Sequence, residues 1–184
     1  MNTIYPQPKL SVSAPVEKCF GDSVRVAIKI NTPAGLKITD YTCNWSNDAP
    51  TTGTMAAGAD SIIVFHVFSN AGNQSVTVFV RSGTPGTCFS DTVTVPVYIN
   101  RLPLPNYTIA PVSCAGEVVA FTDLSSSADG AINKWKWIFG NTLVSSLQNP
   151  STTYASPGTY TSSLQVESNK GCISTVLSKP VVVN

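Results

Sequence analysis

The sequence is poor in charged residues, and this scarcity excludes several classes of protein. Asp, Glu, Lys and Arg make up 11% of the 184 residues, less than half of the roughly 25% typical of soluble domains. The formal net charge is +1 and no basic cluster occurs, so we expect no binding to nucleic acid or to anionic lipid. No apolar run approaches the roughly 18–20 residues of a membrane span, so we expect no membrane insertion.

Residues that carry catalysis or hold metals are equally sparse. His66 is the single histidine, and because it lies inside an apolar run we interpret it as a packed residue rather than a general base. No Cys-x-x-Cys spacing or paired carboxylate motif stands out. A calcium site would have to use Asp123, Asp129, Asn133 and Asn141, which offer few carboxylates for the roughly six to eight oxygens that calcium prefers. We therefore predict no enzyme, no cofactor and no metal.

Ser, Thr, Val, Gly and Pro take the place of the missing charges, and this composition is typical of short strands joined by turns. Residues 75–82 (SVTVFVRS) place Val76, Val78 and Val80 on one face at a period of two. Residues 60–68 (DSIIVFHVF) form an apolar run of strand length, which predicts a strand buried on both sides. No stretch has a sustained helical period, so the sequence predicts an all-β fold.

An internal repeat divides the chain. CFSDTVTVPVYIN (88–100) and CISTVLSKPVVVN (172–184) share Cys, Ser, Pro, Val and Asn without a gap, 184 − 100 = 84 residues apart. The linker between the copies, NRLPLPN, is stiffened by Pro103 and Pro105. We predict two tandem immunoglobulin-like β-sandwich domains at 1–101 and 102–184, each near the roughly 100 residues of that fold.

The second copy carries a more specific pattern. A Trp-x-Phe-Gly strand (137–140) is followed by Asn149-Pro150, by Tyr154 and by PGTY at 157–160. This pattern resembles the polycystic kidney disease (PKD) domain over roughly 104–184, and the first domain resembles a divergent PKD or immunoglobulin-like relative. The resemblance implies a sandwich with the aromatic strand in its middle and Tyr160 in a position like the tyrosine corner.

Two details refine this resemblance. The Cys-x-Gly opening (114–116) and the Gly-Cys closing (171–172) resemble PKD domains of large surface proteins of gliding bacteria that use type IX secretion. The family usually has Phe-Gly-Asp-Gly, whereas this chain has Phe139-Gly140-Asn141-Thr142. That departure weakens any calcium contact inferred from the family and leaves the packing prediction intact.

The tryptophans of the aromatic strand could face a ligand or the core. On a strand, Trp135 and Trp137 share one face with Phe139, and Lys134 and Lys136 share the other. Because lysines favour solvent, we predict that the aromatic rings point inward. With Trp45, which the repeat places beside this strand, the predicted core aromatics are Trp45, Trp135, Trp137, Phe139 and Tyr160.

Five cysteines in a Ser/Thr-rich chain indicate an oxidising compartment. The repeat groups Cys19, Cys88, Cys114 and Cys172 as disulfide candidates and leaves Cys43 as a buried free thiol. Pairing within the domains would join Cys19 to Cys88 and Cys114 to Cys172. In an immunoglobulin-type sandwich these partners lie at opposite ends, whereas a disulfide needs Cα atoms within about 7 Å. A Cys19–Cys172 bond across the junction is therefore the alternative, and the sequence leaves both schemes open.

Three triplets, DSV (22–24), DSI (60–62) and DTV (91–93), resemble the O-glycosylation signal of the same bacterial group. They make Ser23, Ser61 and Thr92 candidates for modification. A turn aspartate before a β-branched strand gives the same triplet, so a purely structural origin is the alternative.

The first residues lack the apolar core of a signal peptide, and we expect the chain to be a piece of a longer protein. We predict an extracellular or cell-surface spacer or stalk, as in an adhesin of gliding bacteria, whose partners are neighbouring repeat domains. The alternative is an accessory module of a secreted hydrolase that binds a polysaccharide or a surface protein. Exposure of the indole rings distinguishes the two, because a spacer buries them.

Overall fold

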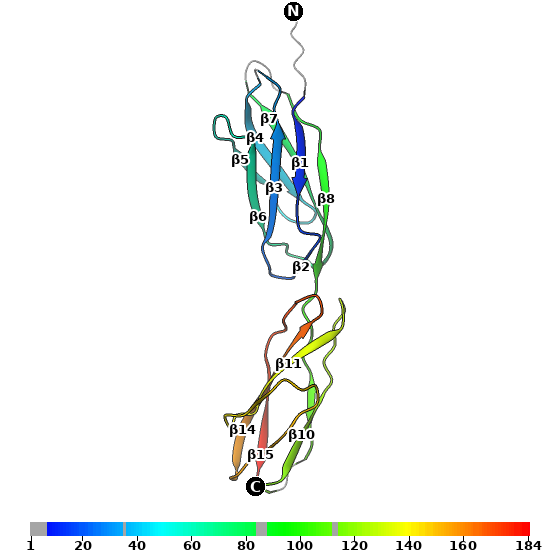
Figure 1. Ribbon diagram of the computed structural model, residues 1–184, viewed down its shortest axis with the longest axis vertical. Coiled ribbons are helices and arrows are strands. Elements are labelled where there is room, and N and C mark those ends of the chain that lie inside the picture. The colour runs from blue at the N-terminus through cyan, green and yellow to red at the C-terminus, as the bar shows by residue number, and fades with distance from the viewer. Residues whose placement is uncertain (1–6, 35, 84–87, 112–113) are drawn as a thin grey trace, which may run out of the picture. The chain divides into compact units, whose positions relative to one another are not determined.

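The computed structural model describes residues 7–34, 36–83, 88–111 and 114–184. It divides the chain into two compact units, Met1–Ile99 and Asn100–Asn184, each of them a stack of antiparallel strands (Figure 1). The division falls two residues before the boundary expected from the sequence. Within the described ranges, no helix has the length and apolar character needed to cross a membrane.

The first unit contains eight of the strands. They are β1 (Lys9–Ser13), β2 (Glu17–Cys19), β3 (Val24–Asn31), β4 (Ile38–Trp45), β5 (Thr51–Thr54), β6 (Ser61–His66), β7 (Gly72–Ser82) and β8 (Val93–Asn100). The second unit contains β9 (Tyr107–Ile109), β10 (Val118–Asp123), β11 (Ile132–Ile138), β12 (Val144–Ser145), β13 (Ser151–Thr153), β14 (Gly158–Ser168) and β15 (Leu177–Val183).

Two sheets enclose the core of the first unit, with strand orders β1-β3-β6 and β2-β8-β7-β4-β5. On β7, Val76, Val78 and Val80 are fully buried, as the period of two predicts. The predicted burial of both faces of β6 is wrong, because Ile63 and Phe65 are 51% and 62% exposed. The reason is that β6 lies at the border of a three-stranded sheet whose outer face is open to solvent (Figure 1).

The second unit repeats this plan with the sheets β13-β10-β9 and β12-β11-β14-β15. Its core is aromatic: Trp137 of β11 is fully buried and packs edge-on against Tyr107, with ring centroids 5.0 Å apart. Phe121 completes the cluster with a centroid 5.6 Å from that of Trp137. The observed architecture is thus all-β with immunoglobulin-like sandwiches, as predicted.

The repeat is also visible in individual hydrogen bonds. The amide of Val80 donates to Ser90 Oγ at 3.0 Å, and the amide of Val166 donates to Ser174 Oγ at 3.0 Å. In return, the amides of both serines donate to the carbonyls of the same two valines. Because Ser90 and Ser174 occupy matching places in the two aligned segments, the two units share a detailed local structure as well as a fold.

The turn after β11 contains the departure from the PKD pattern. Thr142 has a φ of 72° and is the one residue other than glycine with positive φ in the described part of the chain. It stands where the family usually has glycine. Since a β-branched residue is rare in the left-handed region, Thr142 is strained. Gly140, at φ 78°, must in contrast be glycine, because a Cβ at this position would lie 2.7 Å from the Thr161 carbonyl oxygen.

We predict that Thr142→Gly raises the free energy of unfolding of the second unit by roughly 0.5–1 kcal/mol, since relief of strain exceeds the added entropy of the unfolded chain. Urea denaturation of the full chain measures the change. Thr159→Gly, in the extended strand β14, is the matched control and should destabilise the unit. Equal effects of the two substitutions would contradict the strain at Thr142.

Candidate functional site

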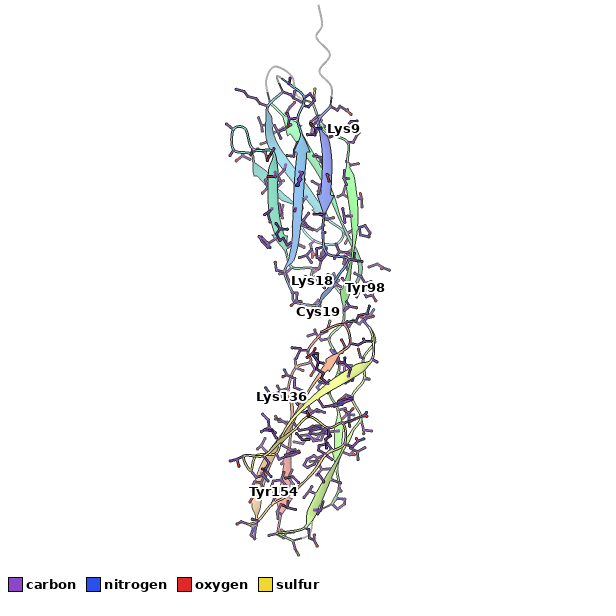
Figure 2. The ribbon with its side chains drawn as sticks, viewed as in Figure 1. Lys9, Lys18, Cys19, Tyr98, Lys136 and Tyr154 are labelled. Carbon is purple, nitrogen blue, oxygen red and sulfur yellow. The ribbon has the colours of Figure 1, made fainter. Side chains whose placement is uncertain are left out.

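The aromatic strand β11 faces the interior of the second unit. Trp137 is 0% exposed and its indole N–H donates to the carbonyl of Leu147 at 2.9 Å. Phe139 is 2% exposed, whereas Lys134 and Lys136 are exposed on the other face; Lys136 is labelled in Figure 2. These rings therefore form the core and offer no surface to a ligand.

Trp135, the third aromatic side chain of this strand, is half-buried. Its indole N–H donates to Asp123 Oδ2 at 2.7 Å, and Asp123 Oδ1 accepts from the amide of Ser125 at 3.0 Å. The side chain of Asn149 accepts from the amide of Asp123 at 2.8 Å. Trp135 thus anchors a loop at the border of the core, which explains why its ring is less enclosed than that of Trp137.

The tyrosine corner follows the prediction from the resemblance. The hydroxyl of Tyr160 donates to the carbonyl of Ser156 at 2.9 Å, and its ring centroid lies 4.3 Å from that of Tyr154. Tyr154 is buried and donates to the carbonyl of Phe139 at 3.0 Å. Burial raises the pKa of Tyr154 to about 12. The Tyr154 hydroxyl therefore stays a neutral donor, and each of the two hydroxyl groups ties its ring to a backbone carbonyl at the end of a strand.

The four residues considered for calcium are not assembled into a site. Asp129 accepts a hydrogen bond from the amide of Arg101 at 2.7 Å and forms an ion pair with its guanidinium at 3.3 Å. Asn141 donates to the carbonyl of Thr153 and accepts from the amide of Leu143. Among the residues that the structure describes, no group of three or more His, Cys, Asp or Glu side chains could hold a metal.

His66 packs flat against Trp45. The ring centroids are 4.1 Å apart with an interplanar angle of 5°, and Trp45 is 3% exposed. His66 Nε2 lies 2.9 Å from Asp48 Oδ2. Hydrogen bonds from Ser69 and then from His66 hold the pKa of Asp48 below its ordinary value of 3.8. This cluster of Trp45, His66 and Asp48 closes one border of the first core.

The cysteines are in two states. Cys19 and Cys172 are disulfide-bonded, whereas Cys43, Cys88 and Cys114 are free thiols. The pairing of Cys19 with Cys88 and of Cys114 with Cys172 is therefore wrong. Cys43 is fully buried and free, as the sequence suggested, and burial raises the pKa of its thiol to about 11.

Geometry explains why pairing within the units fails. Cys172 is hydrogen-bonded to Ser168 at one end of β14, and Ala115, next to Cys114, is hydrogen-bonded to Asn184 beyond the other end. The eleven residues of β14 span about 33 Å at roughly 3.3 Å per residue, far beyond the reach of a disulfide.

The first unit has the same separation. The backbone of Cys88 is hydrogen-bonded to that of Ser82 at the end of β7. Cys19 is the last residue of β2 and lies near Tyr98, at the opposite end, where β7 starts (Figure 2). Pairing between Cys19 and Cys172 stays a prediction.

The predicted glycosylation residues are all accessible. Ser23 directly precedes β3, Ser61 begins β6 and Thr92 directly precedes β8, and each is exposed. Ser61 Oγ donates to Asp60 Oδ1 at 3.0 Å. Their modification stays a prediction. The alternative, that each triplet is only a turn aspartate followed by a strand, agrees equally well with the local structure.

A shallow groove of about 380 Å³ lies on the outer face of the five-stranded sheet. Arg81 donates to Asp40 Oδ2 from Nε at 3.0 Å and from Nη2 at 2.6 Å, and this contact lowers the pKa of Asp40. Beside the ion pair, Phe79 and Phe89 lie with ring centroids 6.2 Å apart, and Phe89 is 52% exposed. Threonine hydroxyls complete the lining, from Thr42, Thr52 and Thr54. No periodic signal in the sequence predicts this groove, because sheet pairing assembles it from β4, β5, β7 and the segment that contains Phe89.

The lowered pKa of Asp48 predicts that the stability of the first unit decreases in acid. Because the pKa of Asp48 is lower in the folded than in the unfolded chain, its ionised carboxylate stabilises the fold at pH values above 3.8. This stabilisation is lost as the pH falls through the folded-state pKa. We expect Asp48→Asn to lower the free energy of unfolding at pH 7 by up to about 1 kcal/mol, with the difference from the unmodified chain vanishing near pH 2. Urea titration followed at the Trp45 indole NMR signal measures both. Asp22→Asn, at an exposed aspartate, should leave stability unchanged; a pH-independent loss for Asp48→Asn would contradict linkage.

Tryptic mapping without reductant tests the cysteine pairing. We expect the peptide 19–25, which contains Cys19, to be linked to the peptide 171–184, which contains Cys172. In the folded chain, an aromatic disulfide reagent should modify exposed Cys114 quickly and reach Cys43 only after denaturation, because burial keeps that thiol protonated. A linkage that includes Cys88 or Cys114 would contradict the assignment.

Comparison with known proteins places the second unit in a family. The family model of the PKD domain matches residues 100–183. The PKD1 domain of Vibrio anguillarum Epp is 31% identical, with 46% of this chain and 99% of that domain covered and a TM-score of 0.41. The PKD1 domain from the Vibrio cholerae metalloprotease PrtV is 25% identical, with 45% and 98% covered and a TM-score of 0.41.

A more distant likeness spans both units. The fibronectin(III)-like modules of Clostridium thermocellum CbhA are 14% identical, with 96% of this chain and 94% of those modules covered and a TM-score of 0.42. No curated protein matches the chain. The family-model match and the 31% identity across nearly all of a PKD domain confirm the resemblance carried by the Trp-x-Phe-Gly and PGTY motifs: through residues 100–183, the chain belongs to the PKD domain family.

Proposed function

We propose that the chain is a non-catalytic structural segment of a larger secreted or cell-surface protein, and that it serves as a spacer or stalk of an adhesin such as those exported by the type IX pathway in gliding bacteria. The observation that carries this proposal is the enclosure of the indole rings. Trp45 is 3% exposed and Trp137 is 0% exposed. Their large apolar area stabilises the two sandwiches instead of serving as a stacking platform for a ligand.

Self-contained cores support the same proposal. The buried residues form two separate clusters, one for each unit. A unit that closes its own core can be repeated along a chain, as in other modular proteins. The proposed partners are therefore neighbouring repeat domains of the same protein.

The proposed location rests on the thiol chemistry. Cys19 and Cys172 are disulfide-bonded, and such bonds persist in oxidising compartments. The PKD1 domain that belongs to the Vibrio cholerae metalloprotease PrtV is similar to the second unit, which supports a role as one module of a larger protein. We therefore propose that the chain lies outside the cell or on its surface.

Single-molecule stretching tests the spacer role. Pulled from its two ends under reducing conditions, the chain should resist force and unfold in two events, one for the 99 residues of the first unit and one for the 85 of the second. If Cys19 is bonded to Cys172, the 172 − 19 − 1 = 152 residues between them cannot extend before reduction. Each of these residues would otherwise add up to about 3.5 Å to the extended length. The extension of the oxidised chain should then be much shorter.

The outcomes separate the two ideas. Cys172→Ser should extend fully without reductant and is the control for the disulfide. Equal extension of the oxidised and reduced chain would overturn only the Cys19–Cys172 pairing. Unfolding without measurable resistance, or a single event for the whole chain, would overturn the spacer role.

The groove of the first unit favours a second candidate function, that of a glycan-binding accessory module of a secreted hydrolase. Exposed Phe89 offers a ring for stacking against a sugar, and the Asp40–Arg81 pair offers polar groups beside it. Titration with soluble xylan, laminarin and hydroxyethyl cellulose distinguishes the candidates. A glycan module would show NMR shifts at Phe79 and Phe89 that Phe89→Ala abolishes, whereas a pure spacer would show none.

A further inference from the structure

Strand β6 has a free edge in the described structure. It is the last strand in the order β1-β3-β6. The amide of Ile30 donates to the carbonyl of Asp60, and the register pairs Ile28 with Ile62 and Val26 with Val64. Because hydrogen-bonded pairs alternate along antiparallel strands, residues 60, 62 and 64 direct their backbone groups toward β3. Residues 61, 63 and 65 therefore direct their N–H and C=O groups away from the sheet.

The same three residues point their side chains to solvent. Ser61, Ile63 and Phe65 are exposed, whereas Val64 is 6% exposed and faces the core. The edge thus presents backbone donors and acceptors together with an apolar side-chain row. Val67, directly after the strand, extends this row and is 52% exposed.

The other border strands of the described sheets carry features that discourage pairing. Strands β2, β9, β12 and β13 have three residues or fewer. Strand β5 has four residues and includes Gly53, and β1 begins with Lys9. Strand β15 is long but contains Lys179 and Pro180. Strand β6, with the sequence SIIVFH, has none of these features.

The outer face of this sheet is positively charged. Strands β1, β3 and β6 contain no acidic residue, and Lys9, Arg25 and Lys29 are exposed on them. None of these three side chains forms an ion pair with another residue that the structure describes. In the register with β6, Arg25 lies beside Phe65 and Lys29 lies beside Ser61. The carboxylate of Asp60, directly before β6, accepts a hydrogen bond from Ser61, so three cationic side chains face one acidic side chain at this border.

We propose that the free edge of β6 binds an extended, acidic peptide segment of a partner protein, which adds a fourth strand to the β1-β3-β6 sheet. The backbone groups of Ser61, Ile63 and Phe65 would pair with the segment, as in other cases of strand addition. Apolar side chains of the segment face Ile63 and Phe65. A carboxylate faces Ser61, whose small side chain leaves room for the Lys29 ammonium group to reach across.

Charge also argues against a second copy of this chain as the occupant. In a symmetric antiparallel pair centred on Ile63, Ser61 of each copy would face Phe65 of the other. Each such row would then end in Lys29 of one copy and Arg25 of the other, and neither row contains an acidic residue. A segment with carboxylates removes this repulsion.

A designed peptide tests the proposal on the full chain. The probe is the capped, fluorescein-labelled peptide TETVTVT, which as a strand parallel to β6 places its glutamate beside Ser61 and its two valines beside Ile63 and Phe65. We expect saturable binding in the sub-millimolar range by fluorescence anisotropy. In ¹⁵N NMR spectra, the amides of Ser61, Ile63 and Phe65 should exchange quickly with solvent in the free chain and shift on binding, whereas the amide of Val64 should stay protected.

Variants separate the backbone, apolar and charge contributions. Ile63→Pro removes a donor from the free edge and no hydrogen bond to β3, so binding should weaken about tenfold, the loss of one or two net hydrogen bonds. Ile63→Ser keeps the backbone and removes the apolar contact, and should also weaken binding. Val182→Ser, at a 59% exposed valine of the border strand β15, is the matched control and should leave binding unchanged.

A charge exchange gives the sharpest test. Lys29→Glu should weaken binding of TETVTVT and strengthen binding of the peptide TKTVTVT. Equal binding of both peptides to the unmodified chain, or shifts outside β6, would overturn the proposal. Dimers that protect the Ile63 amide without peptide would identify a second copy as the occupant, and dextran sulfate that shifts the same amides and displaces the peptide would identify a polyanion. Both results would also overturn it.

Discussion

The fold depends on the pleat of two long strands, β7 and β14, which send every second side chain between the sheets. On β7 the inward row is Val76, Val78 and Val80, and on β14 it includes Leu164 and Val166. Each strand pairs with neighbours on both sides. A slip of one residue would expose a whole row to solvent, so burial fixes the register. Everything that lies on the outer faces is positioned by these two rows.

Local sequence carried much of this information. The alternation on β7 and the opposition of lysines and tryptophans on β11 predicted which faces are buried, because the period of a strand depends on the pleat alone. The motif PGTY similarly predicted the hydrogen bond of Tyr160 to the backbone. Trp135 was harder to assign, since its exposure depends on how the Asp123 loop closes over it.

Features that depend on sheet order could not be read from the sequence. The run at 60–68 reads as fully buried, yet Ile63 and Phe65 face solvent because the outer face of the β1-β3-β6 sheet is open. The same holds for the groove of Phe79 and Phe89 and for the cysteine states. Repeat logic grouped Cys88 with Cys172, although one is a free thiol and the other is disulfide-bonded. Cys88 and Cys172 thus make the same backbone hydrogen bond in the two units but differ in oxidation state.

The burial of Cys43 ties oxidation to the order of folding events. Its thiol lies in the core on β4 with no exposed surface, so once the sheets close it is unreactive toward oxidants. Before they close, the same thiol competes with Cys19 for any disulfide partner. In an oxidising compartment, the first sandwich must therefore assemble faster than its thiols are oxidised. Rapid burial of the Cys43 side chain then prevents this thiol from forming a wrong disulfide.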